Sequence, residues 1–315
     1  MSQLSFASLT AKKKTPLRAD IFLEEMGKVV PWKRILRLLT PFYYDNKTGR
    51  PAYPLILMIK IYCLQQWYRL ADLSMEEAIY DRRSFASFLE IDLMLNPIPD
   101  ETTILGFRHF IEKHNLAPEI FHLINKFLEE KGLMMKEGTI VDATIISSPS
   151  STKNNDKKRD PEMSSTRKNG QWYFGMKTHI GTDVKSGLVH SVEVTPAKTA
   201  DVDMTMDLLH GEEKSIFGDK AYMKKEDKKW AREKNIFWGV PDRKKPKCCL
   251  SKSQRKRNDK LKRVRAKVEY PFRIIKELWG HRKTRYKGLY KNLNQMLMLF
   301  GLSNLYMSRK SLLIT

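Results

Sequence analysis

The hydrophobic pattern of this 315-residue chain changes at Gly138. Over residues 31–135, short apolar stretches recur at helical spacing and are separated by polar turns. From Thr139 to Ile146 the sequence TIVDATII is rich in β-branched residues, which is typical of a buried strand. We therefore predict a basic arm over residues 1–30, an all-helical domain over residues 31–135, and a domain that contains a sheet over residues 136–310.

The helical half carries local signals for where its helices begin and end. Ser74-Met-Glu-Glu77 has the spacing of a capping box, and Asp100 precedes another apolar stripe as an N-cap. Pro118 and Gly132 bracket a further helix. Consecutive short helices of this kind could hold a helix-turn-helix that binds DNA, or form a plain bundle for packing or dimerisation. The sequence leaves both open.

Beyond Gly138, strand-like and helix-like stretches alternate. Residues 147–170 are polar and predict a long loop. The predicted strands span residues 139–146, 172–182, 188–195, 215–218 and 236–240, and the predicted helices span 201–210, 224–234, 255–279 and 292–307. This order predicts a mixed α/β layer fold.

Positive charge is concentrated in the second half of the chain. Residues 1–138 carry 19 Lys/Arg and 17 Asp/Glu, a net of +2, whereas residues 139–315 carry 39 and 19, a net of +20. Nucleic acid is the usual partner of such a surface. An anionic membrane is the weaker alternative, because we find no basic amphipathic helix with a broad apolar side.

The same composition limits the compartment. The chain has no run of eighteen apolar residues that could span a membrane and no apolar segment typical of a secretion signal. Its three cysteines cannot form a disulfide framework and lack the paired spacing of a zinc site. We expect a cytoplasmic protein without a membrane partner.

Three acidic residues in the second half are candidate metal ligands. Asp142 interrupts an apolar strand, Asp219 directly follows a strand, and Glu269 lies on a predicted helix. Each has an ordinary alternative: a hydrogen-bonded strand residue, a helix N-cap, and an ion-pair partner of Arg265. Together they would supply the hard oxygen ligands that Mg²⁺ or Mn²⁺ prefers. Two such ions can promote displacement at phosphorus.

The predicted helix over residues 255–279 combines two stripes. Its apolar stripe is formed by Leu261, Val264, Val268, Phe272, Ile275 and Trp279. A second stripe contains Lys262, Arg265, Glu269 and Lys276, which share one face at helical spacing. One carboxylate among cations is consistent with a metal site that also holds a polyanion.

Several long motifs resemble one known family. They include GRPAYPLILMIKIYCLQQWYRLADLSMEEAIYDRRSF, PDETTILGFRHFIEKHNL, GTIVDATIISSPSSTKN, RDPEMSSTRKNGQWYFGMKTHIGTDVKSGLVHSV, FGDKAY, RAKVEYPFRIIK and RYKGLYKNLNQMLMLFGLSNL. In these stretches, from about residue 20 to residue 308, the chain resembles the DDE-type insertion-sequence transposases of the branch named after insertion sequence five.

The resemblance implies a site and a fold. It implies a ribonuclease-H-like core in which Asp142, Asp219 and Glu269 are the catalytic residues and bind Mg²⁺ or Mn²⁺, as two ions. The family signature Tyr-x2-Arg-x3-Glu-x6-Lys matches Arg265, Glu269 and Lys276, but Lys262 stands where tyrosine is expected. The DNA-binding residues that we expect are Arg265, Lys276, Lys262, Lys244, Lys245, Arg255, Arg257 and Arg285, with a basic insertion at 243–260.

The implied activity is DNA transposition, by cleavage at the element ends and transfer of the 3′-hydroxyl into target DNA. The partners would be the terminal inverted repeats, recognised by the helical half, the target DNA, and at least one further copy of the chain, in the cytoplasm at the nucleoid. Two alternatives remain: a nuclease without strand transfer, and an inactive DNA-binding remnant. We also expect one or two of the aromatic side chains at 172–174 to pack in the core, and His179 to be a core histidine.

Overall fold

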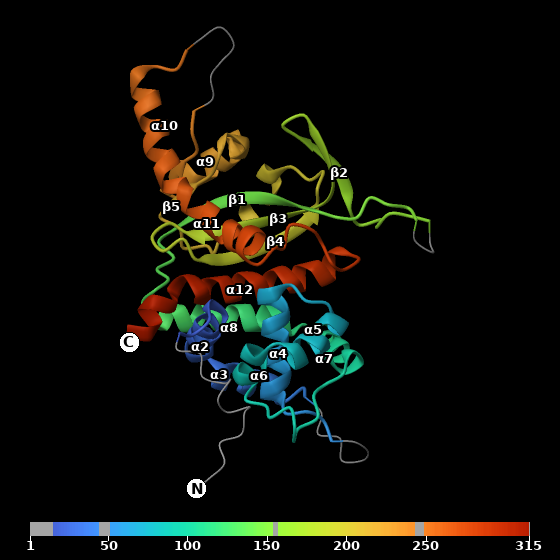
Figure 1. The fold of residues 1–315 in the computed structure, drawn as a ribbon. Coiled ribbons are helices and arrows are strands. Elements are labelled where there is room, and N and C mark those ends of the chain that lie inside the picture. The colour runs from blue at the N-terminus through green and yellow to red at the C-terminus, as the bar shows by residue number, and fades with distance from the viewer. Residues whose placement is uncertain (1–14, 44–50, 154–156, 243–248, 315) are drawn as a thin grey trace.

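The computed structural model describes residues 15–43, 51–153, 157–242 and 249–314. In Figure 1 a sheet lies above the C-terminal helix α12, and the helices of the N-terminal half lie below it. The two halves predicted from the sequence are therefore joined through one central helix.

The N-terminal half is helical, as predicted. Its helices are α2 (Arg18–Val29), α3 (Trp32–Leu39), α4 (Leu55–Tyr68), α5 (Asp72–Asp81), α6 (Arg83–Leu89), α7 (Glu101–Lys113) and α8 (Leu116–Glu130). Asp100 is confirmed as the N-cap of α7, because its side chain accepts a hydrogen bond from the backbone N–H of Thr103.

Two sequence predictions in this half are corrected. Helix α2 lies within the stretch that we predicted to be an arm, and it buries Leu23, Met26 and Val29. The capping box predicted at Ser74 is wrong, because the N-cap of α5 is Ala71, three residues earlier. Ser74 therefore sits inside the first turn of the helix.

The second half contains a mixed six-stranded sheet. The strands are β1 (Gly138–Ser147), β2 (Ser164–Lys168), β3 (Gln171–Asp183), β4 (Val189–Pro196), β5 (Ser215–Phe217) and β6 (Phe237–Gly239). The order is β2-β3-β1-β5-β6, and β4 also pairs with β3. β1 is antiparallel to β3 but parallel to β5, which is parallel to β6. This arrangement confirms the predicted α/β core and is consistent with a ribonuclease-H-like fold.

Strand β2 corrects the prediction of an uninterrupted loop over residues 147–170. It pairs with the first part of β3 from Ser164 opposite Gly175 to Lys168 opposite Gln171. The two turn residues, Asn169 and Gly170, both have positive φ, at 50° and 81°. Asn-Gly is the preferred sequence for a two-residue hairpin turn of this kind.

Helical segments complete the second half, and most of them are short. They are η1 (Asp201–Met204), η2 (Met206–Leu208), η3 (Lys220–Tyr222), α9 (Lys225–Glu233), α10 (Lys252–Arg265), η4 (Ala266–Val268), α11 (Glu269–Arg273), η5 (Ile274–Leu278) and α12 (Leu289–Ile314). The helix predicted over 201–210 is two 3₁₀ turns. The helix predicted over 255–279 is present but changes from α to 3₁₀, back to α, and then to one π turn.

Helix α12 is the centre of the core. It packs against α8 on one side and β4 on the other. Buried Asn304 donates hydrogen bonds to Asn125 Oδ1 (2.8 Å) and to the Val189 carbonyl (2.7 Å), and it accepts one from the Val189 amide (2.8 Å). One hydrophobic cluster runs from Leu23 to Leu305. No helix in the described part of the chain is long and apolar enough to cross a membrane.

Candidate active site

The pairing of β1 with β5 brings two of the predicted acidic residues together. The last paired residues of these parallel strands are Ile140 and Phe217. Continuing this register by two residues places Asp142 level with Asp219. Neighbouring strands are separated by about 4.8 Å, so the two residues lie side by side at the point where β5 ends and β1 continues.

Backbone contacts orient both carboxylates. Asp142 Oδ1 accepts a hydrogen bond from the Ala143 amide at 2.8 Å. Asp219 Oδ1 accepts one from the Ala221 amide at 2.6 Å, which caps η3. Asp142 is therefore a hydrogen-bonded strand residue and Asp219 is an N-cap, as the ordinary alternatives proposed, and the two residues are also neighbours.

Asp142 lies in an environment that disfavours its charge. Burial raises the pKa of its carboxyl to about 6, and the nearby negative charge of Asp219 contributes to the increase. The Ala143 hydrogen bond, Arg265 and Lys168 act in the opposite direction on this pKa. The site therefore combines crowded carboxylates with cations at its border.

Two predicted cations on the helical segment above β1 reach this region. Arg265 is close enough to affect the pKa of Asp142, and its buried Nε has no hydrogen-bond partner among the described residues. Lys276 Nζ donates to Thr144 Oγ1 (2.5 Å) and to the Ile145 carbonyl (2.7 Å), which attaches the π turn to β1. Burial, and then Lys168, lower the pKa of Lys276 to about 8.

Sequence reasoning missed two residues of the site. Lys168 lies at the tip of the β2–β3 hairpin, and its positive charge lowers the pKa of both Asp142 and Lys276. The buried hydroxyl of Tyr222 has no hydrogen-bond partner in the described structure, and burial and Asp142 raise the pKa of its phenol. The Asn-Gly turn signal could have revealed the hairpin; for Tyr222 the sequence offered only its closeness to Asp219.

Glu269 does not join the two aspartates in this structure. Its side chain is exposed and lines a surface hollow of about 430 Å³ beside Tyr270, Arg273 and Lys276. Within the described residues, no three His, Cys, Asp or Glu side chains are arranged to hold one metal ion. The structure also records no ion pair between Glu269 and Arg265. The role of Glu269 as a metal ligand stays a prediction.

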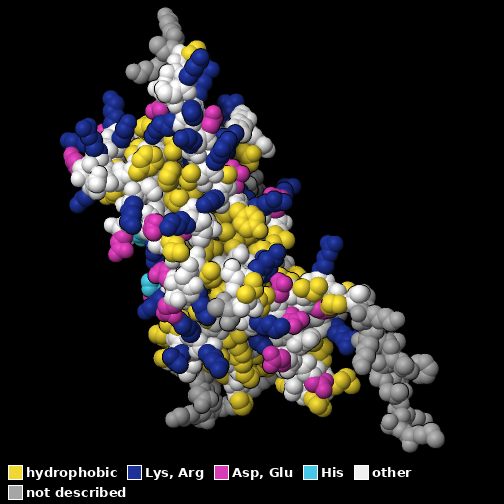
Figure 2. Space-filling view, turned by 90° about the vertical axis from the view of Figure 1, so that its left-hand side faces the viewer, with side chains coloured by type: hydrophobic (Ala, Val, Ile, Leu, Met, Phe, Trp, Pro, Cys, Tyr) yellow, Lys and Arg dark blue, Asp and Glu magenta, His cyan; other side chains and the backbone are white. Residues whose placement is uncertain are grey.

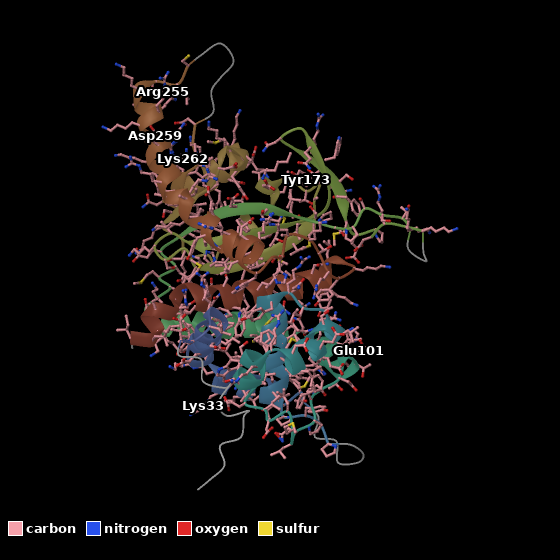
Figure 3. All side chains as sticks on the ribbon, viewed as in Figure 1. Lys33, Glu101, Tyr173, Arg255, Asp259 and Lys262 are labelled. Atoms are coloured by element: carbon pink, nitrogen blue, oxygen red, sulfur yellow. The ribbon has the colours of Figure 1, made fainter. Side chains whose placement is uncertain are left out.

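The other predicted DNA-binding residues occupy different settings. Arg255 and Lys262 project outward from α10, together with Asp259 (Figure 3). Arg257 instead donates hydrogen bonds to the Trp238 and Val240 carbonyls and to Asp242, so it also fastens α10 to the end of β6. Arg285 is exposed, in the segment before α12. Lys244 and Lys245 lie outside the described residues.

The distribution of charged side chains on the surface agrees with the difference in net charge between the two halves of the chain. Figure 2 shows Lys and Arg side chains gathered over the upper part of the molecule, which contains α10, and a closer mixture of both signs lower down. The basic half and the carboxylate pair thus belong to the same part of the fold.

Other expectations concerned residues near the sheet. His179 is buried, its Nε2 lies 2.8 Å from Thr195 Oγ1, and burial lowers its pKa to about 4, which confirms a core histidine. Phe174 packs against the core, as expected for one of the three aromatic residues, whereas Trp172 is 68% exposed. Asp201 pairs with Lys177 at 2.8 Å.

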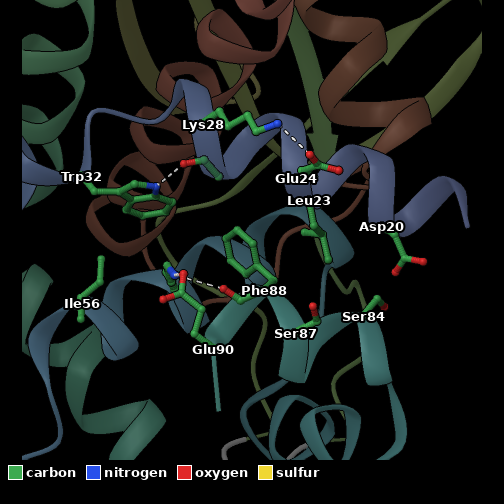
Figure 4. Close-up of a pocket in the computed structure, with 12 residues that line it drawn as sticks. Asp20, Leu23, Glu24, Lys28, Trp32, Ile56, Ser84, Ser87, Phe88 and Glu90 are labelled. Atoms are coloured by element: carbon green, nitrogen blue, oxygen red, sulfur yellow. Dashed lines mark hydrogen bonds and ion pairs between the residues drawn. The ribbon is translucent and has the colours of Figure 1, made fainter. Parts of the chain in front are cut away.

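A hollow of about 650 Å³ lies far from the aspartates, between helices of the N-terminal half (Figure 4). Lys28 pairs with Glu24 at 2.7 Å and Lys60 with Glu90 at 2.7 Å, and Asp20 accepts a hydrogen bond from the Leu17 amide. Trp32 Nε1 donates to the Gly27 carbonyl. We assign the chemistry to the aspartate pair and not to this hollow.

Comparison with known families decides the identity of this arrangement. A family model described as "Transposase DDE domain" matches residues 134–305, more than half of the chain. The chain belongs to the DDE transposases. A second model, "Transposase domain (DUF772)", matches residues 10–110 in the helical half. This DDE transposase is thus an enzyme that acts on DNA, and the matches are consistent with the insertion-sequence-five branch without deciding it.

DDE transposases generally use divalent metal ions, and the residues present fit such an ion. Asp142 and Asp219 offer hard carboxylate oxygens at one edge of the sheet, and each carboxylate has a second oxygen besides the one that accepts a backbone amide. The raised pKa of Asp142 shows that additional positive charge would be favourable there. Mg²⁺ needs few protein ligands because it retains water.

Proposed function

We propose that this transposase cleaves DNA at the ends of its insertion element and joins the freed 3′-hydroxyl to target DNA. The observation that carries the proposal is the parallel register that sets Asp142 level with Asp219, beneath a helical segment that supplies Arg265 and Lys276. Carboxylates bordered by cations suit a reaction at a phosphodiester.

Asp142 and Asp219 would hold the divalent ions, Mg²⁺ or Mn²⁺, and Glu269 would complete the ligand set. When bound, two such ions activate an attacking oxygen and stabilise a leaving oxygen at phosphorus. The raised pKa of Asp142 means that protons compete for this site below about pH 6.

The cations of the chain would position the DNA. Arg265 has a buried Nε without a partner in the described structure, so its guanidinium can donate to a phosphate oxygen. Lys276 is anchored by two hydrogen bonds to β1, and its ammonium group would contact the DNA backbone near the cut. Arg255 and Lys262 on α10 would extend the contact along the backbone of the duplex.

The two halves would divide the recognition of DNA. The basic half, with its net charge of +20, would supply general affinity, and the near-neutral helical half would choose the terminal inverted repeats. Because an element has two ends, we propose that the active complex contains at least two copies of the chain, as a symmetric dimer on paired ends.

The decisive experiment incubates the full-length protein with DNA that carries its element ends and Mg²⁺, and maps the cuts. We expect nicks at the element boundary that need the metal and are lost in Asp142→Asn. A pre-cut end supplied with plasmid should become joined to it. Cutting without joining would indicate a nuclease, and metal-independent binding without cutting would indicate an inactive remnant.

A further inference from the structure

The tip of the β2–β3 hairpin exposes a tryptophan beside an arginine. Trp172 is 68% exposed and stands directly opposite Arg167 in the antiparallel ladder. Lys168 occupies the next position of β2, and residues 164–175 contain no Asp or Glu. Trp172 therefore offers a large aromatic face next to positive charge, in a stretch without negative charge.

The turn holds these side chains in fixed positions. Positive φ at both Asn169 and Gly170 defines a two-residue turn whose twist matches that of the flanking strands. The register therefore cannot slip without moving every side chain to the opposite side. Trp172 and Arg167, as a directly opposed pair, are kept on the same side of the hairpin.

The hairpin is close to the active site. At its base, Gly175 pairs with Ser147 of β1, and a Cβ on Gly175 would lie 2.2 Å from the Ile146 carbonyl oxygen, so the hairpin begins tightly against the end of β1. A hollow of about 190 Å³ is shared by Arg167 and Lys168 with Thr144 of β1. Lys168 also acts on the pKa of Asp142 and of Lys276. DNA held at the aspartates would therefore meet the tip of the hairpin.

We propose that Trp172 stacks on an unpaired nucleobase of the DNA end being cut, while Arg167, on the same side of the hairpin, holds an adjacent phosphate. This proposal rests on the proposed function. Bases inside a duplex are covered by their neighbours, so only an unpaired base offers a free face to the ring. An apolar protein partner would leave Arg167 without opposite charge, whereas a nucleotide supplies a ring and a phosphate together.

The test compares two DNA probes in chelator, where no cutting occurs. One is a labelled duplex of random sequence, and the other is the same duplex with a short unpaired 3′ end. The full-length protein should prefer the unpaired end. Trp172→Ala should weaken binding to that probe at least about fivefold and leave affinity for the fully paired duplex unchanged. Trp172→Phe should retain most of the preference.

A matched control is Phe237→Ala, which removes another half-exposed aromatic ring from β6, at the opposite edge of the sheet. It should keep the preference for the unpaired end. Melting temperatures and elution volumes of all variants test whether the fold and the oligomeric state are retained.

Several results would overturn the proposal. An equal loss of affinity for both probes would make the hairpin a general backbone contact, and an altered oligomeric state without an effect on DNA would make it a self-association surface. If the wild type binds both probes and Trp172→Ala binds them with the same affinities, the hairpin proposal alone fails. If the wild type binds neither probe, the proposed function fails with it.

Discussion

Asp142→Asn should stabilise the fold of the metal-free protein and abolish cleavage. The carboxyl of Asp142 is largely buried, and burial raises its pKa from 3.8 to about 6. Asparagine has nearly the same shape, and its side-chain oxygen can still accept the hydrogen bond from the Ala143 amide. The substitution therefore removes the charge with little change in packing.

The size of the effect follows from linkage. Between pH 3.8 and about 6 the folded state binds more protons at Asp142 than the unfolded state does, so the free energy of unfolding falls as pH rises through this interval. One pKa unit corresponds to about 1.4 kcal/mol, so the upward shift of about two units amounts to at most about 3 kcal/mol above pH 6. Because the side chain keeps some exposure, we expect Asp142→Asn to gain about 1–3 kcal/mol at pH 8.

Urea unfolding in chelator, at pH 8 and near pH 4, measures this gain. It should be largest at pH 8 and shrink towards pH 4, where the wild-type carboxyl is protonated in the folded state. Added Mg²⁺ should raise the stability of the wild type and not that of the variant.

The matched control is Asp219→Asn, because asparagine is as good an N-cap as aspartate and keeps the cap of η3. This variant should also lose cleavage, but its stability should change by less than about 0.5 kcal/mol. Equal stability of wild type and Asp142→Asn at pH 8, or a gain that does not depend on pH, would refute the reasoning.

Three further predictions use other parts of the structure. Glu269→Gln should reduce cutting by orders of magnitude with duplex affinity unchanged, as compared by mapped nicks and filter binding; near wild-type cutting would leave Glu269 an exposed helix residue. The cleavage rate should increase as pH rises towards about 6, because Asp142 loses its proton, and bound Mg²⁺ should move this increase to lower pH. The rate should decrease above about pH 8 as Lys276 loses its proton. Lys276→Arg should shift the alkaline decrease upward, and an unshifted profile would exclude Lys276 as its cause. Deletion of residues 1–135 should yield insoluble protein, because α12 packs against α8; a soluble, folded fragment would contradict the shared core.

Much of the site was predictable because its two aspartates obey a local rule. An acid inside an apolar strand and an acid directly after a later strand indicate functional groups at the edge of a sheet. The sequence alone could not show which strands are neighbours. The pairing of β1 with β5, which places Asp142 beside Asp219, joins residues that are far apart in the chain.

The hairpin was missed for a different reason. Residues 164–168, SSTRK, are polar on both faces, and β2 carries little of the hydrophobic alternation that identifies a half-buried strand. Its formation depends on the Asn-Gly turn and on the partner strand β3. The strand propensity of residues 164–168 was therefore a weaker indication of β2 than the Asn-Gly turn that follows them.

The position of Glu269 shows how a change of helical repeat defeats a prediction from spacing. The stripe from Lys262 to Lys276 was drawn with one uniform helical period, but a 3₁₀ turn separates Arg265 from Glu269, and a π turn contains Lys276. A 3₁₀ turn advances each residue further around the axis than an α turn does, and a π turn advances it less. Arg265 and Lys276 still reach β1, at Asp142 and Thr144, while Glu269 opens onto the surface hollow. A modest rewinding of η4 would rotate Glu269 relative to β1 without breaking the anchor of Lys276. If Glu269 is a ligand, metal and DNA should therefore protect the amides of η4 from hydrogen exchange, and unchanged exchange there would count against its recruitment.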